Sequence, residues 1–197
     1  MKHPQLPSRM MLKVSLMLFS YFLFAACMQH DESVSPRNSR GLENEAITGQ
    51  TGHGSLMKNT FTAHLNSANE VNPNGVISKG QGQAIFKLSD DGASLHYKLI
   101  VANIDSMTQA HIHCGEAGVN GSVVVFLFGF VPTGVTTNGI LAEGDITAAN
   151  IIPRPEPACS PGLQTFQDLI DRLRNGTAYV NVHTIAYPGG EIRGQIH

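Results

Sequence analysis

Short segments with apolar residues at every second position fill most of the chain after residue 58. Side chains of a β-strand alternate between two faces, so this pattern predicts strands that turn one face to a core. Gly, Pro, Asn and Asp separate the segments and favour turns. The expected strands cover residues 61–65, 79–88, 93–102, 107–114, 123–130, 140–146, 177–184 and 191–196. Segment 123–130 is apolar on both faces, which predicts a central position or a covering loop.

One segment, after the Pro-rich residues 153–161, has helical rather than strand periodicity. Its apolar residues recur three or four positions apart, and Asn175-Gly176 supplies a stop signal. We therefore expect a helix over about residues 163–175. Together these patterns predict an all-β fold, an antiparallel Greek-key β-sandwich of about eight strands with one inserted α-helix.

The first 26 residues have the pattern of an export signal. Three basic residues and no acid precede an apolar run of 13 residues at 14–26. A membrane-spanning helix needs about 20 apolar residues, whereas a secretory signal peptide uses a run of this length. Phe24-Ala25-Ala26-Cys27 resembles a bacterial lipobox, so we expect cleavage before Cys27 and lipidation of its thiol; plain secretion is the alternative. Residues 27–58 are polar and predict a flexible tether, and residues 59–197 form the expected domain.

Composition and charge restrict the partners. The chain has 14% charged residues, a formal net charge of −2 and no cluster of Lys and Arg, which argues against nucleic-acid binding. The lipobox predicts an exported protein held at the bacterial cell envelope by its lipid. Met28 stands where an aspartate would favour the inner membrane, so the outer membrane is open as its destination. The expected partners are this membrane and an unidentified protein or envelope component.

Three histidines carry the only specific chemical hypothesis. In segment 107–114, His111 and His113 alternate with core-type residues and share the opposite face. His183 leaves segment 177–184 on its polar face. If the two strands are close, three outer-face imidazoles can hold one copper or zinc ion, with His64 or His96 as a further ligand. The other interpretation is structural: the histidines bond to covering loops such as residues 115–121.

Four stretches of the chain resemble a known family. They are FTAHLNSANEVNP (61–73), GQAIFKL (82–88), AHIHCGEAGVNGSVVVFL (110–127) and AYVNVHTIAYPGGEIRGQI (178–196). In this order they resemble the CHRD domain, the module repeated in chordin and found singly in microbial secreted proteins. His64 and Asn72 depart from the usual family pattern. The resemblance implies an extracytoplasmic β-domain and names no activity.

We therefore expect an envelope-anchored CHRD lipoprotein that acts as a non-enzymatic binding or structural module, including an adhesin-like role. The alternative is a copper or zinc protein, for storage or as a mononuclear redox centre. No catalytic residues are predicted, since the chain lacks nucleophile-elbow, phosphate-loop and paired-carboxylate motifs. Glu191 and Arg193 share a strand face and predict an ion pair, with Glu70 orienting Arg193 or capping a loop.

The histidine pattern also bears a distant likeness to the copper half of Cu/Zn superoxide dismutase, another Greek-key sandwich. That enzyme places an H-x-H strand and a later histidine outside its barrel. In this chain no histidine lies between Cys114 and Ile146, so its bridging histidine and zinc loop have no counterpart. Dismutase activity is therefore not expected.

Two cysteines remain once Cys27 is assigned to the lipid. Cys114 and Cys159 form an even pair in an oxidising compartment, which predicts a disulfide. It would close a loop of about 45 residues and stabilise the fold by roughly 4 kcal/mol. The alternative makes Cys114, beside His113, a soft metal ligand.

Overall fold

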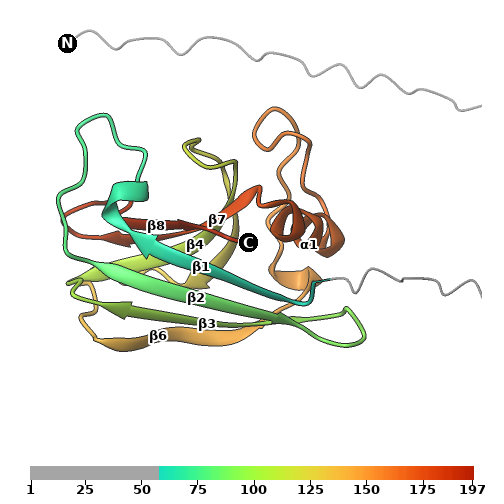
Figure 1. The fold of residues 1–197 in the computed structure, drawn as a ribbon, viewed down its shortest axis with the longest axis horizontal. Helices are drawn as coiled ribbons and strands as arrows, with labels where there is room; N and C mark the ends of the chain where they lie inside the picture. The colour runs from blue at the N-terminus through green and yellow to red at the C-terminus, as the bar shows by residue number, and fades with distance from the viewer. Residues whose placement is uncertain (1–57) are drawn as a thin grey trace, which may run out of the picture. The chain divides into compact units, whose positions relative to one another are not determined.

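The computed structural model describes residues 58–197, which form an all-β domain with one α-helix (Figure 1). The predicted class is confirmed, and the expected segments differ from the strands by only a few residues at their ends. The strands are β1 (Thr60–Asn66), β2 (Gln81–Leu88), β3 (Leu95–Ala102), β4 (Met107–Cys114), β5 (Val123–Phe128), β6 (Gly139–Ile146), β7 (Ala178–Thr184) and β8 (Ile192–Gln195). The helix is α1 (Phe166–Asn175), and short 3-10 turns lie at Ser67–Asn69 and Ala148–Asn150.

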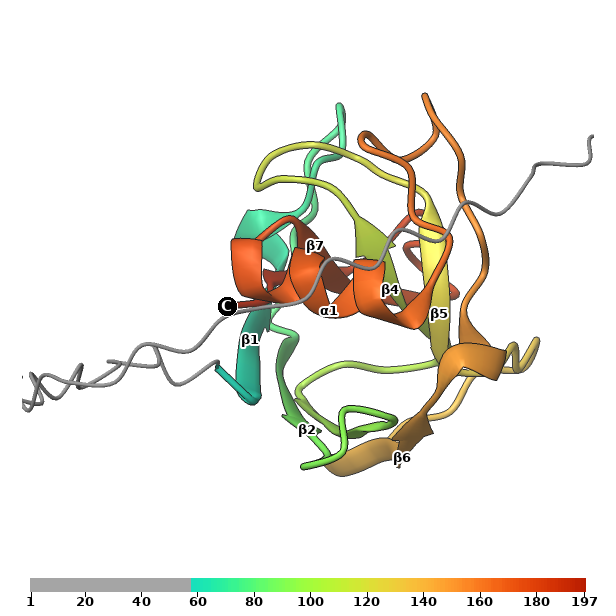
Figure 2. The ribbon, with the colours of Figure 1, turned by 90° about the vertical axis from the view of Figure 1, so that its right-hand side faces the viewer.

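All eight strands belong to one antiparallel sheet in the order β5-β4-β7-β8-β1-β2-β3-β6. The sheet curls until its two edge strands approach each other, as the view in Figure 2 shows. Across the remaining opening, Tyr97 Oη of β3 donates a 2.6 Å hydrogen bond to Leu127 O of β5. The sandwich is thus one folded, nearly closed sheet rather than two separate layers.

The interior of this sheet holds the alternating apolar residues. Phe61, Leu65, Phe86 and Leu99 are almost entirely buried there, as the period-two pattern predicts. The turn between β2 and β3 is also the expected one: Gly92 adopts a left-handed conformation with φ of 69° and donates to Ser89 O at 2.9 Å.

Helix α1 lies across the curled sheet beside β7 (Figure 2). Thr165 caps its N-terminus by accepting from Asp168 N, and Gly176 ends it in the left-handed region with φ of 67°. The helix begins at Phe166 and not at 163, because Leu163 pairs with Arg154 in an isolated β-bridge. This pairing ties the Pro-rich loop to the start of the helix.

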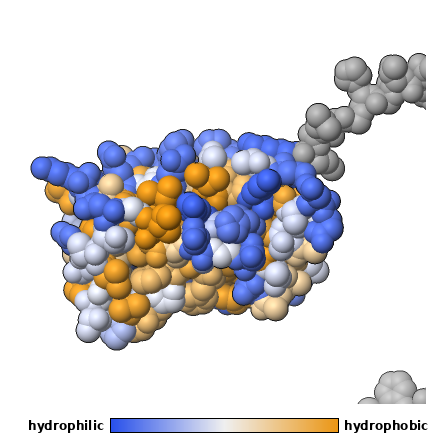
Figure 3. Space-filling model, turned by 90° about the horizontal axis from the view of Figure 1, so that it is seen from below, coloured by the Kyte–Doolittle hydropathy of each residue, from blue (hydrophilic) through white to orange (hydrophobic). Residues whose placement is uncertain are grey.

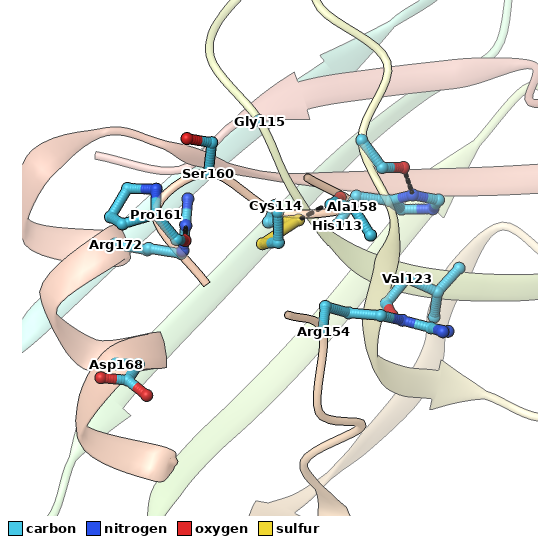
Figure 4. The surroundings of a disulfide bond; sticks show 12 residues. His113, Cys114, Gly115, Val123, Arg154, Ala158, Ser160, Pro161, Asp168 and Arg172 are labelled. Atoms are coloured by element: carbon cyan, nitrogen blue, oxygen red, sulfur yellow. Dashed lines mark hydrogen bonds between the residues drawn. A yellow bond between two sulfur atoms is a disulfide. The ribbon is translucent and has the colours of Figure 1, made fainter. Parts of the chain in front are cut away.

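A disulfide joins Cys114, the last residue of β4, to Cys159 in the Pro-rich loop (Figure 4). The predicted bridge is confirmed, and it fastens the loop ahead of α1 to the strand that carries His111 and His113. The alternative role of Cys114 as a metal ligand is wrong, since its sulfur takes part in the disulfide.

Strand β5 lies at an edge of the sheet, so the central position expected for segment 123–130 is wrong. The covering loop is present: Arg154 Nε donates to Val123 O at 2.8 Å, and Ile152 N donates to Val124 O at 2.9 Å. Val124 and Val125 are buried, whereas Phe126 is half exposed. The loop satisfies the strand's free edge in place of a neighbouring strand.

Apolar side chains also reach the surface, where they alternate with polar ones on the face drawn in Figure 3. The large exposed apolar residues in 58–197 include Ile77, Phe126, Phe130, Ile140 and Ile185. Among the helices that the structure describes, none has the length and hydropathy to span a membrane. The expected signal peptide (1–26), the lipidation site Cys27 and nearly all of the tether (27–58) lie outside the described residues.

Candidate metal centre

The candidate site lies on two neighbouring strands, β4 and β7. They pair antiparallel, with Gln109 opposite His183, His111 opposite Asn181 and His113 opposite Tyr179. Residues two apart on a strand share a face, so His111, His113 and His183 all leave the sheet on the side away from the apolar core. The sequence hypothesis required these two strands to lie close together, and they are neighbours in the sheet.

The three imidazoles meet on that face. His111 Nδ1 lies 3.1 Å from His183 Nε2, and one nitrogen from each of the three residues lies within 4.8 Å of the others. The ring centroid of His113 is 5.5 Å from that of His111 and 6.1 Å from that of His183. Two nitrogens that each lie about 2.0 Å from one metal ion are at most about 4.0 Å apart. The 3.1 Å separation meets this limit, whereas a separation of 4.8 Å requires the rings to move together by about 1 Å when an ion binds.

The site is buried, and the cover includes the loop 115–121 that the structural interpretation of the histidines had named. His111, His113 and His183 are 3%, 8% and 7% exposed. Loop residues 115–121 and the turn at residues 187–190 fold over the strands, and the ring of Phe126 meets His111 edge-on at 4.5 Å. Alternation along a strand shows which side chains leave the core, but it does not show that loops bury them again.

Hydrogen bonds to these loops fix the position of each proton. His113 Nδ1 contacts Gly121 O at 2.9 Å, and His183 Nδ1 contacts Pro188 O at 2.8 Å. A carbonyl oxygen only accepts, so both Nδ1 atoms carry the proton and both Nε2 atoms carry a lone pair. His111 Nδ1 then donates to His183 Nε2 and occupies its lone pair, whereas the lone pairs of His111 Nε2 and His113 Nε2 stay free. The loop-holding role of the histidines is thereby present, and it orients their other nitrogens as metal ligands require.

Two of these lone pairs are buried without a partner. Within residues 58–197, His111 Nε2 and His113 Nε2 find no hydrogen-bond donor, and neither does Asn181 Oδ1 on the same face of β7. A buried polar atom without a partner costs about 1–3 kcal/mol. A bound cation would use the imidazole lone pairs, so the residues present fit a copper or zinc ion.

The surroundings keep the imidazoles neutral. Burial lowers the pKa of His111 to about 3, with a further decrease from the neighbouring imidazoles. Burial also lowers the pKa of His113 to about 4, and it lowers the pKa of His183. Neutral imidazole is the form that binds metals, so protons do not compete for these nitrogens near neutral pH.

A stack of three side chains supports His113. Its ring lies on the ring of Tyr179 at 4.8 Å and 10°, and the guanidinium of Arg193 covers the other side of Tyr179 at 3.4 Å. Arg193 also donates to Asn120 Oδ1 at 2.9 Å and to Val119 O. Arg193 therefore fastens the covering loop 115–121 over the site.

The expected ion pair between Glu191 and Arg193 is wrong. Although both are buried on β8 or beside it, Glu191 accepts instead from Ser78 Oγ at 2.5 Å and Thr184 Oγ1 at 2.6 Å. Glu191 is thus bound by Ser78, which precedes β2, and by Thr184 of β7. Arg193 instead binds Asn120 and Val119 of the covering loop.

Glu70 lies close to Arg193 without a direct ion pair. Its carboxylate accepts from Asn181 Nδ2 at 3.1 and 3.2 Å. Burial raises the pKa of Glu70 to about 7, against the lowering effect of the Arg193 charge. Glu70 thereby holds Asn181, the residue directly opposite His111.

The structure does not bring His64 or His96 to the three histidines. His64 is exposed on β1, which β8 separates from β7. His96 is exposed on β3, where its Nδ1 lies 3.0 Å from Asp145 Oδ1 of β6. Both side chains point away from the core as predicted, but at other parts of the sheet.

Sequence reasoning missed three residues that shape the site, namely Phe126, Tyr179 and Asn181. The signal for two of them was present, because Tyr179 and Asn181 lie four and two residues before His183 and share its face of the strand. For Phe126 no signal existed, since segment 123–130 is apolar on both faces and its register against β4 shifts twice.

A comparison with protein families identifies the domain that these strands form. The family model for the CHRD domain matches residues 61–196, which is most of the chain and all eight strands. The protein belongs to the CHRD family. CHRD domains are extracellular or secreted binding or structural modules.

Searches of curated proteins and of solved structures found no match to this chain. The likeness to Cu/Zn superoxide dismutase therefore remains a prediction from the histidine pattern.

Proposed function

We propose that the protein is an exported lipoprotein, anchored at the cell envelope through Cys27, whose CHRD domain binds one copper or zinc ion without catalysing a reaction. The ligands are His111, His113 and His183. One observation carries the proposal: three neutral, oriented imidazoles from two adjacent strands converge within 4.8 Å on a buried face.

The buried and ordered arrangement of the three histidines suits the binding of an ion. Two of the histidines are held by backbone carbonyls through Nδ1, so these two rings lose little side-chain freedom when an ion enters. The hydrogen bond between His111 and His183 breaks at that point and frees the lone pair of His183 Nε2 for the ion. The disulfide keeps the end of β4 in place next to His113. A prepared, covered site of this kind suits storage or delivery of an ion.

Metal titration tests this function. Isothermal titration of metal-free protein with copper and with zinc is expected to give one ion per chain with micromolar or tighter affinity. The variant His113→Gln should lose this binding, whereas His96→Gln, on the exposed face of β3, should retain it. Failure of both metals to bind more tightly than millimolar would contradict the proposed function.

The lipid anchor has an independent test. Cells grown with a radiolabelled fatty acid should label the wild-type chain in the membrane fraction, and mass spectrometry should find a mature chain beginning at a lipidated Cys27. A Cys27→Ser variant should remain unlabelled. An unlipidated wild-type chain in the medium would support plain secretion instead.

The behaviour of bound copper under oxidation and reduction tests the non-enzymatic role. The redox alternative predicts that copper-loaded protein cycles between two oxidation states under mild oxidant and reductant, with a spectral change at each step. The binding role predicts one stable loaded form. Repeated cycling without loss of metal would favour a mononuclear redox centre.

A further inference from the structure

The charge of the ion that this site accepts can be inferred from what surrounds it, on the basis of the proposed function. Among residues 58–197, the group of possible ligands contains His111, His113 and His183 and no carboxylate or thiolate. The nearby Cys114 is in the disulfide, and Glu70 is engaged with Asn181. All three ligands are therefore neutral, and a bound ion keeps its full formal charge.

Two positively charged groups lie close to the site. Arg193 stacks on Tyr179, which in turn stacks on His113. Arg154, from the Pro-rich loop, donates to Val123 O, and Val123 pairs with His113 across β4 and β5 (Figure 4). Through these contacts both arginines place a positive charge near His113, so their fields reach the site. The same fields repel a bound cation in proportion to its charge.

Burial adds to this discrimination. The free energy of moving an ion from water into a protein interior rises with the square of its charge, so burying a divalent ion costs about four times as much as burying a monovalent one of equal size. Sites for divalent ions usually offset that cost with anionic ligands, and this group has none.

Coordination number points the same way. Zinc takes four ligands, the fourth being a protein group or water. Cuprous ion is stable with three, and imidazole nitrogen is a suitable donor for copper. Phe126 and the loop at 115–121 cover the three histidines, which leaves them at most 8% exposed. A three-coordinate ion needs no further ligand from outside this cover.

We propose that the three-histidine site is selective for a monovalent, closed-shell cation, and that its ligand is copper in the cuprous state rather than zinc. The ion enters already reduced and is bound without a change of oxidation state, so no electron donor takes part. The partner implied is any source of cuprous ion on the outer side of the membrane.

Competition titrations test the selectivity. Metal-free full-length protein is titrated without oxygen with cuprous ion as its acetonitrile complex, against a chromophoric cuprous chelator. Zinc is titrated against a chromophoric zinc chelator, and silver(I) serves as a monovalent probe without redox chemistry. We expect one ion per chain, with cuprous ion and silver bound at least about 1,000-fold more tightly than zinc.

A charge variant isolates the cause. Arg154→Gln removes a positive charge near His113 but keeps a donor for Val123 O. It should raise zinc affinity relative to silver by about three- to tenfold, since the lost repulsion acts twice as strongly on the divalent ion. The matched control, Arg174→Gln on α1, should leave the ratio unchanged. Circular dichroism melts verify that both variants fold.

The outcomes separate this inference from the proposed function. Zinc binding equal to or tighter than cuprous binding overturns the selectivity and leaves the metal-binding function standing. Absence of binding by all three ions overturns both. Unchanged selectivity in the Arg154→Gln variant overturns repulsion by this arginine as the cause of the selectivity.

Discussion

Strands β3 and β4 carry histidines in the same sequence pattern, yet the two faces differ completely. On β3, His96 alternates with Leu95 and Tyr97, and it is exposed beside Asp145. On β4, His111 alternates with Ala110 and Ile112, and it is buried among other imidazoles. The difference lies in the cover: a loop, a turn and an aromatic ring lie over β4 and β7. Covering loops thus convert surface histidines into a prepared site.

The largest effect on stability is expected from removal of the disulfide, which holds the Pro-rich loop beside the covered histidine face. Replacing both Cys114 and Cys159 by serine opens a link between residues 45 apart. The free energy of unfolding should fall by about 4 kcal/mol, because the unfolded chain regains the entropy of the loop. Urea unfolding of the wild type and the double variant measures this change.

A matched control for the cysteines is the wild-type protein with its disulfide chemically reduced, which should unfold at the same urea concentration as the double variant. A decrease below about 1 kcal/mol, well under the loop-entropy value, would show that the covered face does not depend on this link.

Removing a histidine of the proposed site should weaken metal binding, whereas removing an exposed histidine elsewhere on the sheet should not. His183→Gln takes away the nitrogen nearest to His111, and metal binding should weaken at least about 100-fold, as losing a direct ligand exceeds the usual effect of losing an outer-shell contact. His64→Gln on β1 should change it less than twofold. Competition with a chromophoric chelator measures both. Equal losses in the two variants would mean that the metal binds at another place.

Arg193 tests whether the cover itself is held by specific contacts. Arg193→Met keeps the apolar stem but removes the donors to Asn120 and Val119 and the stack on Tyr179. We expect the free energy of unfolding to fall by about 2 kcal/mol, and the amides of residues 115–121 to exchange faster with solvent. Arg174→Met, on α1, is the control and should leave that exchange unchanged. Protection equal to wild type in the Arg193 variant would show that other contacts hold the loop.

The smallest effect concerns pH. The pKa of Glu70 is raised to about 7 in the folded protein, so the folded state binds its proton more tightly than the unfolded chain. Stability from this group is present at lower pH and is lost as the pH rises through 7. Between about pH 6.5 and 8, unfolding free energy should decrease by about 1 kcal/mol.

The variant Glu70→Gln keeps an acceptor for Asn181 and cannot titrate, so its stability should be nearly constant over that range. Urea unfolding at several pH values compares the two chains. A wild-type curve that is as flat as the variant's would contradict the raised pKa.

The sequence by itself determined the strands, the helix, the disulfide and the family. Each depends on a local or pairwise signal: alternation places Leu99 and Phe61 in the core, spacing and a glycine stop define α1, and only two cysteines remain to pair after Cys27. The sequence also predicted that His111, His113 and His183 lie on the side of their strands away from the core, because alternate residues of a strand share one side of the sheet.

Tertiary structure alone decided what those faces meet. In the folded sheet β4 and β7 are neighbours, and β5 lies at an edge. His64 and His96 lie apart from the three-histidine site. Glu191 accepts hydrogen bonds from Ser78 and Thr184. These outcomes depend on contacts between residues far apart in the chain, and alternation carries no information about them. Burial of the histidines follows from two loops that cross one face, and that burial gives the proposed site its neutral ligands and its charge selectivity.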